Sequence, residues 1–281
     1  MGDLGRWVLI ATGVILLAEI VAGRHRKIYT RNDLFVNGIC IFVGAFVRPL
    51  GAVVVSLLIG WLLPVGKGAL AGMPFWPAVL MIVLVAELFN YGVHRFSHEC
   101  KDTPAGDWLW RMHRTHHTAR YVNVLLNFRT SIFWGLVAGL TWAFSLALYL
   151  GLTKPAAVAI ALFSAWGIVT HADFRWDIPL RNHRLTGPVM RGFEHLFITP
   201  GTHHSHHGYG KDGGNFRNYG VFLAIYDWIF GTLFIPDGRP WRYGLPGTDP
   251  HWADDAMSPL NFSRLVRARK KGKPTGTSLA E

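Results

Sequence analysis

The chain has 281 residues, 51% of them hydrophobic, and a formal net charge of +11 when histidine is counted as neutral. This excess of positive charge is typical of proteins that bind nucleic acid or an anionic membrane face. Several apolar runs approach the roughly 20 residues that a helix needs to cross a bilayer, which favours the membrane and argues against a nucleic-acid partner. The two cysteines, Cys40 and Cys100, provide no disulfide framework, and we expect both thiols to be reduced.

The first third of the chain contains three candidate membrane spans. Residues 4–22 form the first, and the basic cluster at 24–27 that follows is typical of the cytoplasmic end of a span. Residues 34–63 form the second, which Arg48 and the proline after it interrupt. We expect one kinked crossing with Arg48 reaching the headgroups, and two re-entrant halves are the alternative. Residues 75–92 form the third and lead directly into a pair of histidines.

Two later apolar segments, 131–152 and 156–170, are predicted to form a helical hairpin with both ends on the cytoplasmic side. Five crossings would leave the N-terminus outside and every histidine-rich segment inside, and the basic loops agree with that orientation. The predicted fold class is therefore an all-α integral membrane protein, with about four to five transmembrane helices and a cytoplasmic histidine-rich helical cap.

Nine histidines form the candidate metal site. On a helix, positions i, i+3 and i+4 lie on neighbouring parts of one face, so short histidine groups with this spacing can direct their rings to one region. Imidazole suits iron, zinc, copper and nickel, and nine ligands exceed what one ion can take. We predict two ions with four or five nitrogens each. The predicted ligands are His94 and His98; His113, His116 and His117; His171, which follows a later span; and His203, His206 and His207.

The other histidines receive weaker or no assignments. His204 faces away from the stripe of the last group, so we expect it beside the ligands or in solvent. His195, shortly before that group, is a candidate ligand or a neighbour of one. His25 is placed at the level of the headgroups and His183 in a loop, and His251 receives no role.

Three carboxylates are candidates for supporting the ligands. Glu87 falls on the same helical stripe as His94 and His98, and a carboxylate inside a span is costly enough to suggest a function. The alternative is that it lies at the interface and caps polar neighbours. Asp173 and Asp227 are suited to orienting imidazoles by accepting their second N–H, or else to capping loops.

The order HxxxH, HxxHH, single histidine, HxxHH resembles the membrane fatty acid hydroxylase/sterol desaturase superfamily. It is most similar to bacterial sterol-desaturase-family and alkylglycerol-monooxygenase-like members. Thr202 departs from the pattern, since relatives often carry a histidine there, and Tyr226 replaces a usual tryptophan. The supporting matches are Glu87-x3-Tyr91, Thr199-Pro200, Asn218-Tyr-Gly220 and Asp227-x2-Phe-Gly-Thr232, and they add Asn218 to the residues expected near the ligands.

The resemblance implies a non-haem di-iron enzyme that uses O2 to hydroxylate or desaturate an unactivated C–H bond of a membrane lipid. It implies two Fe ions, and two electrons from a separate reductase or ferredoxin-type donor, because the chain carries no convincing flavin or nicotinamide motif. The basic cytoplasmic face is suited to an acidic electron carrier, or to anionic lipid. The expected location is the bacterial inner membrane. The expected domains are N-terminal helices at 1–74, the di-iron domain at 75–235 and a polar, basic tail at 236–281.

Two other classes of function stay open at this point. A membrane metal-dependent hydrolase would use the ions to activate water, although it would usually want carboxylate ligands. A histidine-rich metal transporter would place polar ligands at mid-depth in the bilayer, and a haem protein would need only two of the histidines. Metal analysis distinguishes these classes from an iron oxygenase.

Overall fold

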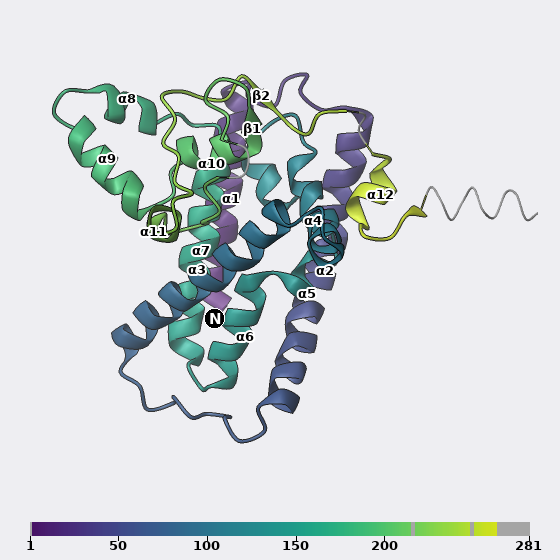
Figure 1. The fold of residues 1–281 in the computed structure, drawn as a ribbon, viewed down its shortest axis with the longest axis vertical. Coiled ribbons are helices and arrows are strands. Elements are labelled where there is room, and N and C mark those ends of the chain that lie inside the picture. The colour runs from purple at the N-terminus through teal and green to yellow at the C-terminus, as the bar shows by residue number, and fades with distance from the viewer. Residues whose placement is uncertain (1, 215–216, 248–249, 263–281) are drawn as a thin grey trace, which may run out of the picture.

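The computed structural model describes residues 2–214, 217–247 and 250–262. The basic residues expected in the tail at 264–273 lie outside the described residues. Within the described part of the chain, four helices are long and apolar enough to cross a membrane, and Figure 1 shows most of the short elements gathered at one end of them. The long helices are α1 (Gly2–Val21), α2 (Arg31–Leu62), α3 (Phe75–Glu99) and α7 (Thr153–His171).

The remaining elements are short. Strands β1 (Gly208–Tyr209) and β2 (Arg242–Tyr243) pair antiparallel. The rest of the described regular structure is helical, so the predicted all-α class is confirmed apart from this pair of strands. The short helices are α4 (Pro104–His117), η1 (Val124–Phe128), α5 (Trp134–Val137), α6 (Gly139–Tyr149), α8 (Asp177–Asn182), α9 (Gly187–Leu196), α10 (Pro200–His207), α11 (Ile225–Ile229) and α12 (Trp252–Ala256).

Helix α2 is continuous through Pro49. Thr30 and Asp33 form a capping box at its start, and its 32 residues extend about 48 Å, well beyond the ~30 Å hydrocarbon core. The alternative of two re-entrant halves is therefore wrong. The expectation for Arg48 is also wrong, since its guanidinium turns inward and bonds to the carbonyl oxygens of Cys40 and Phe128. Neutral backbone acceptors inside the protein take the place of headgroups.

The expected single span at 131–152 is wrong. A turn, α5 and α6 occupy this segment, and the 11 residues of α6 extend only about 16 Å, too short to cross a bilayer. The hairpin with α7 does form, and Gly151 turns the chain with a φ of +89°. Helix α6 packs between α2 and α3. The close approach to α3 depends on Gly139, where a Cβ atom would lie 2.4 Å from the carbonyl oxygen of Phe89.

Small side chains fill the contact between α3, α6 and α7. Ala86, Ala143 and Ala159 are buried there with Phe163. Small residues let helices approach closely, which supplies the packing energy that apolar burial cannot supply within lipid. On the outer face of α2, large apolar side chains are left exposed, including Phe46 at 76%. This exposed apolar surface fits contact with lipid tails.

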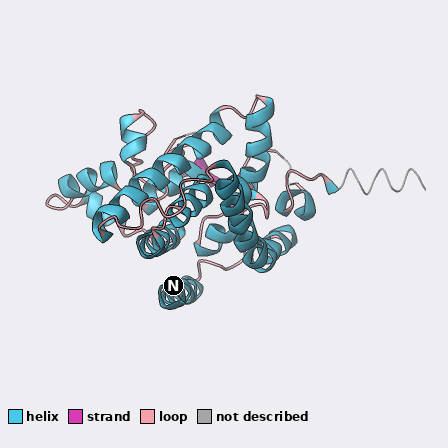
Figure 2. Cartoon of the chain, turned by 90° about the horizontal axis from the view of Figure 1, so that it is seen from below, coloured by secondary structure: helices cyan, strands magenta, loops and turns pink. Residues whose placement is uncertain are grey.

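The end of α1 is fixed by a buried carboxylate. Helix α1 lies at the edge of the bundle against α7 and η1 (Figure 2). Glu19, fully buried, accepts hydrogen bonds from the backbone N–H groups of Val124 and Asp173. His25 also bonds to Glu19 at 2.9 Å and to the hydroxyl of Tyr29. The side chain of His25 therefore turns toward the protein and is only 11% exposed, while its position at the level of the headgroups stays a prediction.

We predict that Gly139→Ala destabilises the protein, because the added methyl group must displace backbone atoms of α3. Overpacking of this kind costs roughly 1–3 kcal/mol, and thermal unfolding in detergent measures it. Gly92→Ala is the matched control, since a Cβ at Gly92 meets nothing within 4 Å. Equal melting temperatures for the two variants would contradict the close approach of α6 to α3.

Candidate metal centre

The nine predicted histidines all lie buried in two adjoining groups at the ends of the long helices. Within each group the candidate ligand nitrogens lie within 4.8 Å of one another. The group sizes, five and four, match the number of nitrogens expected for each of two ions. Cluster A contains His94, His98, His113, His117 and His206, and cluster B contains His116, His171, His203 and His207.

Each HxxHH segment is divided between the two clusters. In α4, His113 and His117 belong to cluster A and His116 to cluster B. In α10, His203 and His207 belong to cluster B and His206 to cluster A. Positions i+3 and i+4 lie about 60° to one side and about 40° to the other side of position i. The two directions let one helix serve both clusters, so the clusters interlock.

Neighbouring rings approach one another through their Nε2 atoms. The separations are 3.0 Å between His113 and His117, 2.9 Å between His171 and His203, and 3.2 Å between His203 and His207. Two nitrogens bound to one ion at about 2.1 Å, with an angle of 90–109° between them, would be about 3.0–3.4 Å apart. The rings are thus spaced as ligands of a shared cation.

Backbone carbonyl oxygens hold the other side of several rings. The Nδ1 of His94 donates to Tyr219, that of His171 to Gly167 and that of His116 to Arg129. A proton on Nδ1 leaves the lone pair of Nε2 for a metal. The Nε2 of His94 is buried and has no hydrogen-bond partner among the described residues. The hydrogen bond from Nδ1 to a backbone carbonyl thus fixes the tautomer in which Nε2 is free to bind a metal.

Burial favours the neutral form of the six cluster histidines on α4 and α10. Burial, followed by repulsion from neighbouring histidines, lowers the pKa of each ring well below the usual value. Neutral imidazole is the form that binds metals. The same direction holds for all six rings, His113, His116, His117, His203, His206 and His207.

A tight connection brings the first two histidine segments together. Thr103 caps α4 by accepting a hydrogen bond from the N–H of Gly106. A Cβ at Gly106 would lie only 1.8 Å from the carbonyl oxygen of Cys100, so glycine is required for this close turn. Trp110 then covers His98, with ring centroids 4.9 Å apart. The start of α4 therefore fixes the angle at which it meets α3.

Helix α10 is held at both ends. Thr199 and Thr202 form a capping box at its start, so Thr202 has a structural use at the position where relatives often carry a histidine. Asn218 adopts a φ of +59° and donates through its amide nitrogen to the carbonyl of Thr202, the hydroxyl of Ser205 and the carbonyl of Phe234. The predicted place of Asn218 beside the ligand segment agrees with these contacts.

Two of the predicted carboxylates support the centre through one loop. Glu87 accepts three backbone hydrogen bonds of 2.7–2.9 Å from residues 221–223. Asp227 accepts from the N–H groups of Tyr219 and Gly220, each at 2.8 Å. The carbonyl of Tyr219 in turn accepts from His94. Neither carboxylate bonds to an imidazole directly, contrary to the role considered for Asp227.

Three other predicted residues lie apart from the clusters. Asp173 faces Arg24 and Arg175, at 3.8 and 3.7 Å. His195 donates to the carbonyl of Arg191 and packs against a tryptophan. His204 is fully buried, with its Nδ1 3.2 Å from the hydroxyl of Tyr243, and within the described part of the chain it belongs to neither cluster. His204 thus lies near the ligands and does not face solvent.

Sequence patterns missed a buried ion network beneath cluster B. Arg129 is 1% exposed and pairs with Asp33 at 2.8 Å and Asp255 at 3.2 Å. Its backbone carbonyl accepts from His116. The two carboxylates are 96 and 126 residues away in sequence, so local spacing held no signal.

A second buried network supports the start of α10. Arg181 pairs with Glu194, and Arg239 pairs with Asp177 through bonds of 2.9 and 2.6 Å. The hydroxyl of Thr199 donates to Glu194 at 3.1 Å. The capping residue of the last histidine helix is therefore fixed by an ion pair that sequence analysis did not identify.

Both clusters face an apolar cavity of about 600 Å³ among the long helices. Rings from cluster A and cluster B form one part of its wall. Leu140, Phe144, Phe163 and Ile168 supply apolar walls, and Val8 of α1 contributes to another side. Cavities of this size commonly hold small molecules. An apolar chain is the ligand that these walls favour.

The fold and site define a mainly helical protein with four candidate membrane spans and two histidine clusters that could bind metal. The sequence model of the fatty acid hydroxylase family matches residues 79–232, just over half of the chain. The chain therefore belongs to the fatty acid hydroxylase family, and the resemblance noted in the sequence is confirmed.

Curated relatives come from the same superfamily. The chain is 30% identical over 190 residues to alkylglycerol monooxygenase of Danio rerio, covering 64% of this chain and 35% of that protein. It is 25% identical over 196 residues to very-long-chain aldehyde decarbonylase GL1-6 of Oryza sativa, covering 66% and 28%. The chain thus spans only about a third of the length of these relatives. No solved structure matches the chain significantly.

We predict that His206→Ala and His116→Ala each remove roughly one bound ion per chain, because an ion held by four or five imidazoles loses a ligand. The two variants test the clusters separately, since the residues belong to different ones. Elemental analysis of protein purified anaerobically gives the iron and zinc content. His195→Ala is the control, and full metal content in either cluster variant would contradict the ligand assignment.

Proposed function

We propose that this protein hydroxylates or desaturates an unactivated C–H bond of a membrane lipid, with its nine clustered histidines holding two iron ions. The observation that carries the proposal is that histidines of both clusters line the apolar cavity. When bound, the iron ions would supply the chemistry that turns O2 and two electrons into an oxidant of C–H bonds. Proposed ligands are the members of clusters A and B.

The residues of this chain perform the other tasks. The apolar walls bind the lipid chain and keep water away from the reacting carbon. The loop held by Glu87 and Asp227 keeps His94 oriented. Whether one or two hydrogens are removed depends on how the cavity places neighbouring C–H bonds, and small changes in that placement alter the outcome.

The ligand set and the relatives support an oxygenase over a hydrolase. Among the described residues, both candidate metal groups consist of histidine alone. Carboxylates, which a hydrolytic site would usually include, are engaged elsewhere with backbone N–H groups. The names of these relatives refer to an alkylglycerol and to a very-long-chain aldehyde. From these relatives we propose a lipid with a long chain as the substrate class of this protein.

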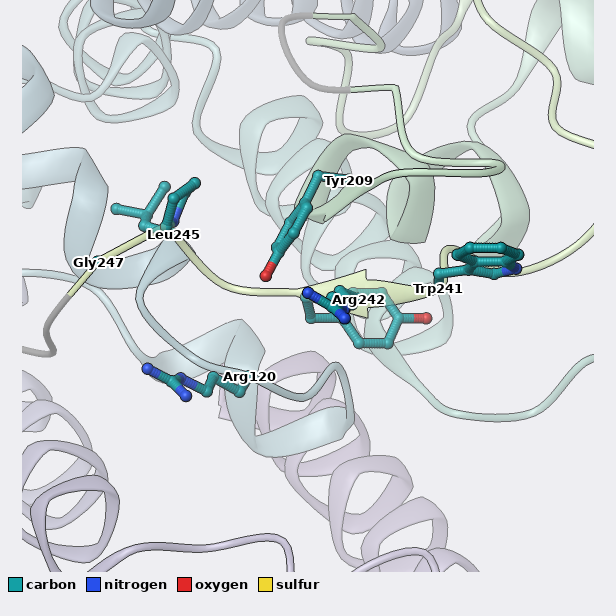
Figure 3. A pocket seen from close by; sticks show the side chains of 8 residues that line it. Arg120, Tyr209, Trp241, Arg242, Leu245 and Gly247 are labelled. Carbon is teal, nitrogen blue, oxygen red and sulfur yellow. The ribbon is translucent and has the colours of Figure 1, made fainter.

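A separate reductase or ferredoxin-type donor would dock on the cap. A polar pocket of about 510 Å³ is lined by Arg120, Tyr209 and Arg242, and Figure 3 shows Arg242 close to Tyr209. Trp241 is exposed beside it. Tyr243 lines the same pocket and its hydroxyl reaches the ring of His204. Positive charge and exposed aromatic surface suit an acidic electron carrier.

The orientation follows from basic residues at the cap end. The cluster at 24–27 joins α1 to α2 at the same end as the histidines, since Asp173 after α7 faces Arg24. Basic residues at span ends favour the cytoplasmic side. We therefore propose a cap on the cytoplasmic side of a bacterial inner membrane.

The function is tested by comparing lipid extracts from cells with and without the protein, grown under ¹⁸O2. We expect a lipid heavier by one labelled oxygen, or lighter by two hydrogens, in cells that carry the protein. The change should disappear in the His116→Ala variant. Near-stoichiometric zinc in the purified protein, with lipid turnover that does not depend on O2, would favour the hydrolase.

Glu87→Gln should lower turnover by roughly tenfold or more, because a weaker acceptor loosens the loop that orients His94. The variant should keep its fold, since the amide retains one oxygen for these hydrogen bonds. Asp107→Asn, which alters a half-exposed carboxylate on α4, is the control. Turnover of the Glu87 variant equal to that of the control would assign Glu87 a purely structural role.

A further inference from the structure

Arg48 places a positive charge inside a candidate membrane crossing. It lies on α2, and its side chain lines the same cavity as the histidines of clusters A and B. A charged residue within a span is costly and by default suggests a function. Arg48 is half-buried by the protein alone, without any contribution from lipid.

The partners of Arg48 in the described residues are all neutral. Its Nη2 donates to the carbonyls of Cys40 and Phe128 and to the hydroxyl of Thr130, with 3.2 Å to the first and the last. By contrast, three other arginines with buried side chains each face a carboxylate. These are Arg129 with Asp33 and Asp255, Arg181 with Glu194, and Arg239 with Asp177.

The surrounding helices are shaped to hold this guanidinium. A Cβ at Gly44 would lie 3.1 Å from its Cζ, so glycine makes room for the group against α2. A Cβ at Gly135 would lie 3.8 Å from the Cα and Cγ atoms of Arg48, an ordinary contact distance, so Gly135 is a direct neighbour of Arg48. All three bonds to the protein start from Nη2, and Nε and Nη1 have no partner among the described residues. These two nitrogens can therefore donate to a ligand.

We propose that Arg48 binds the oxyanion head group, a carboxylate or a phosphate, of the lipid whose chain occupies the cavity. This inference rests on the proposed lipid substrate. An oxyanion supplies the negative counter-charge that Arg48 lacks among its protein partners. Guanidinium forms strong charge-assisted hydrogen bonds with such groups. The remaining walls near Arg48, which include Trp134 and Leu140, accept the hydrocarbon.

Binding of three C16 probes tests the proposal: palmitate, 1-palmitoyl lysophosphatidate and hexadecanol. They share a chain and differ in the head group, and radiolabelled probes give the dissociation constants for the full-length protein in neutral detergent. We expect one or both acids to bind at least tenfold more tightly than the alcohol. Palmitate preferred over lysophosphatidate identifies a carboxylate, and the reverse order identifies a phosphate.

Two variants separate ligand binding from support of the fold. Arg48→Gln should weaken acid binding by roughly tenfold to a hundredfold and leave hexadecanol unchanged, since only the charged contact is lost. Arg48→Lys should keep part of the preference for the acids over hexadecanol. This variant tests the contact if Arg48→Gln does not fold. Ser56→Ala, elsewhere on α2, is the control.

Several outcomes would overturn the inference. A wild-type protein that binds hexadecanol as tightly as the acids has no oxyanion site, even if it oxidises lipid. Equal weakening of all three probes in Arg48→Gln, together with loss of bound metal, would mean that Arg48 only positions residues 128–130 behind His116. A protein that binds none of the probes would contradict both this inference and the lipid substrate itself.

Discussion

Mutual repulsion among nine buried imidazoles is the constraint on which the rest of the structure depends. Their Nε2 atoms lie as close as 2.9 Å, and burial keeps the rings of α4 and α10 neutral. Neutral rings with converging lone pairs are an unfavourable arrangement without a cation and a strong ligand set with one. Backbone carbonyls, helix caps and buried ion pairs then act to hold the rings against one another. The division of each HxxHH segment between two clusters ties the two halves of the centre together.

The two buried ion networks hold the histidine helices to the rest of the cap. Arg129 connects α2 and α12 to the carbonyl that receives His116, and Arg181 with Glu194 fixes the start of α10. Removing such charges from water costs about as much as their attraction returns, so they add little net stability. Their value lies in geometry, since a charge pair is satisfied in only one arrangement.

The sequence was sufficient to predict the helical class and the histidines that gather in the two clusters, but it did not reveal how these histidines are arranged. Histidine spacing is a local property, and it indicated eight members of the two clusters, while the place of His171 after a span indicated the ninth. The partners of Arg129 lie 96 and 126 residues away, and no periodicity records a contact of that kind. The apolar run at 131–152 was long enough for a span, but Gly139 and the turn before it divide the run so that α6 can pack against α3. Hydrophobic length alone cannot distinguish these cases.

The inward direction of Arg48 bears on how the cavity would orient a substrate and which substrates it would select. The cavity is lined by histidines, by the cationic side chain of Arg48 and by apolar side chains. An amphiphile with a charged head can satisfy all three only in one orientation. The carbon that meets the metal centre would then be counted from the head group, because the cation and the histidines are fixed relative to each other by α2 and η1. A neutral lipid would leave the guanidinium desolvated without a counter-charge, a cost that works against its binding and makes the head group itself a basis for selection.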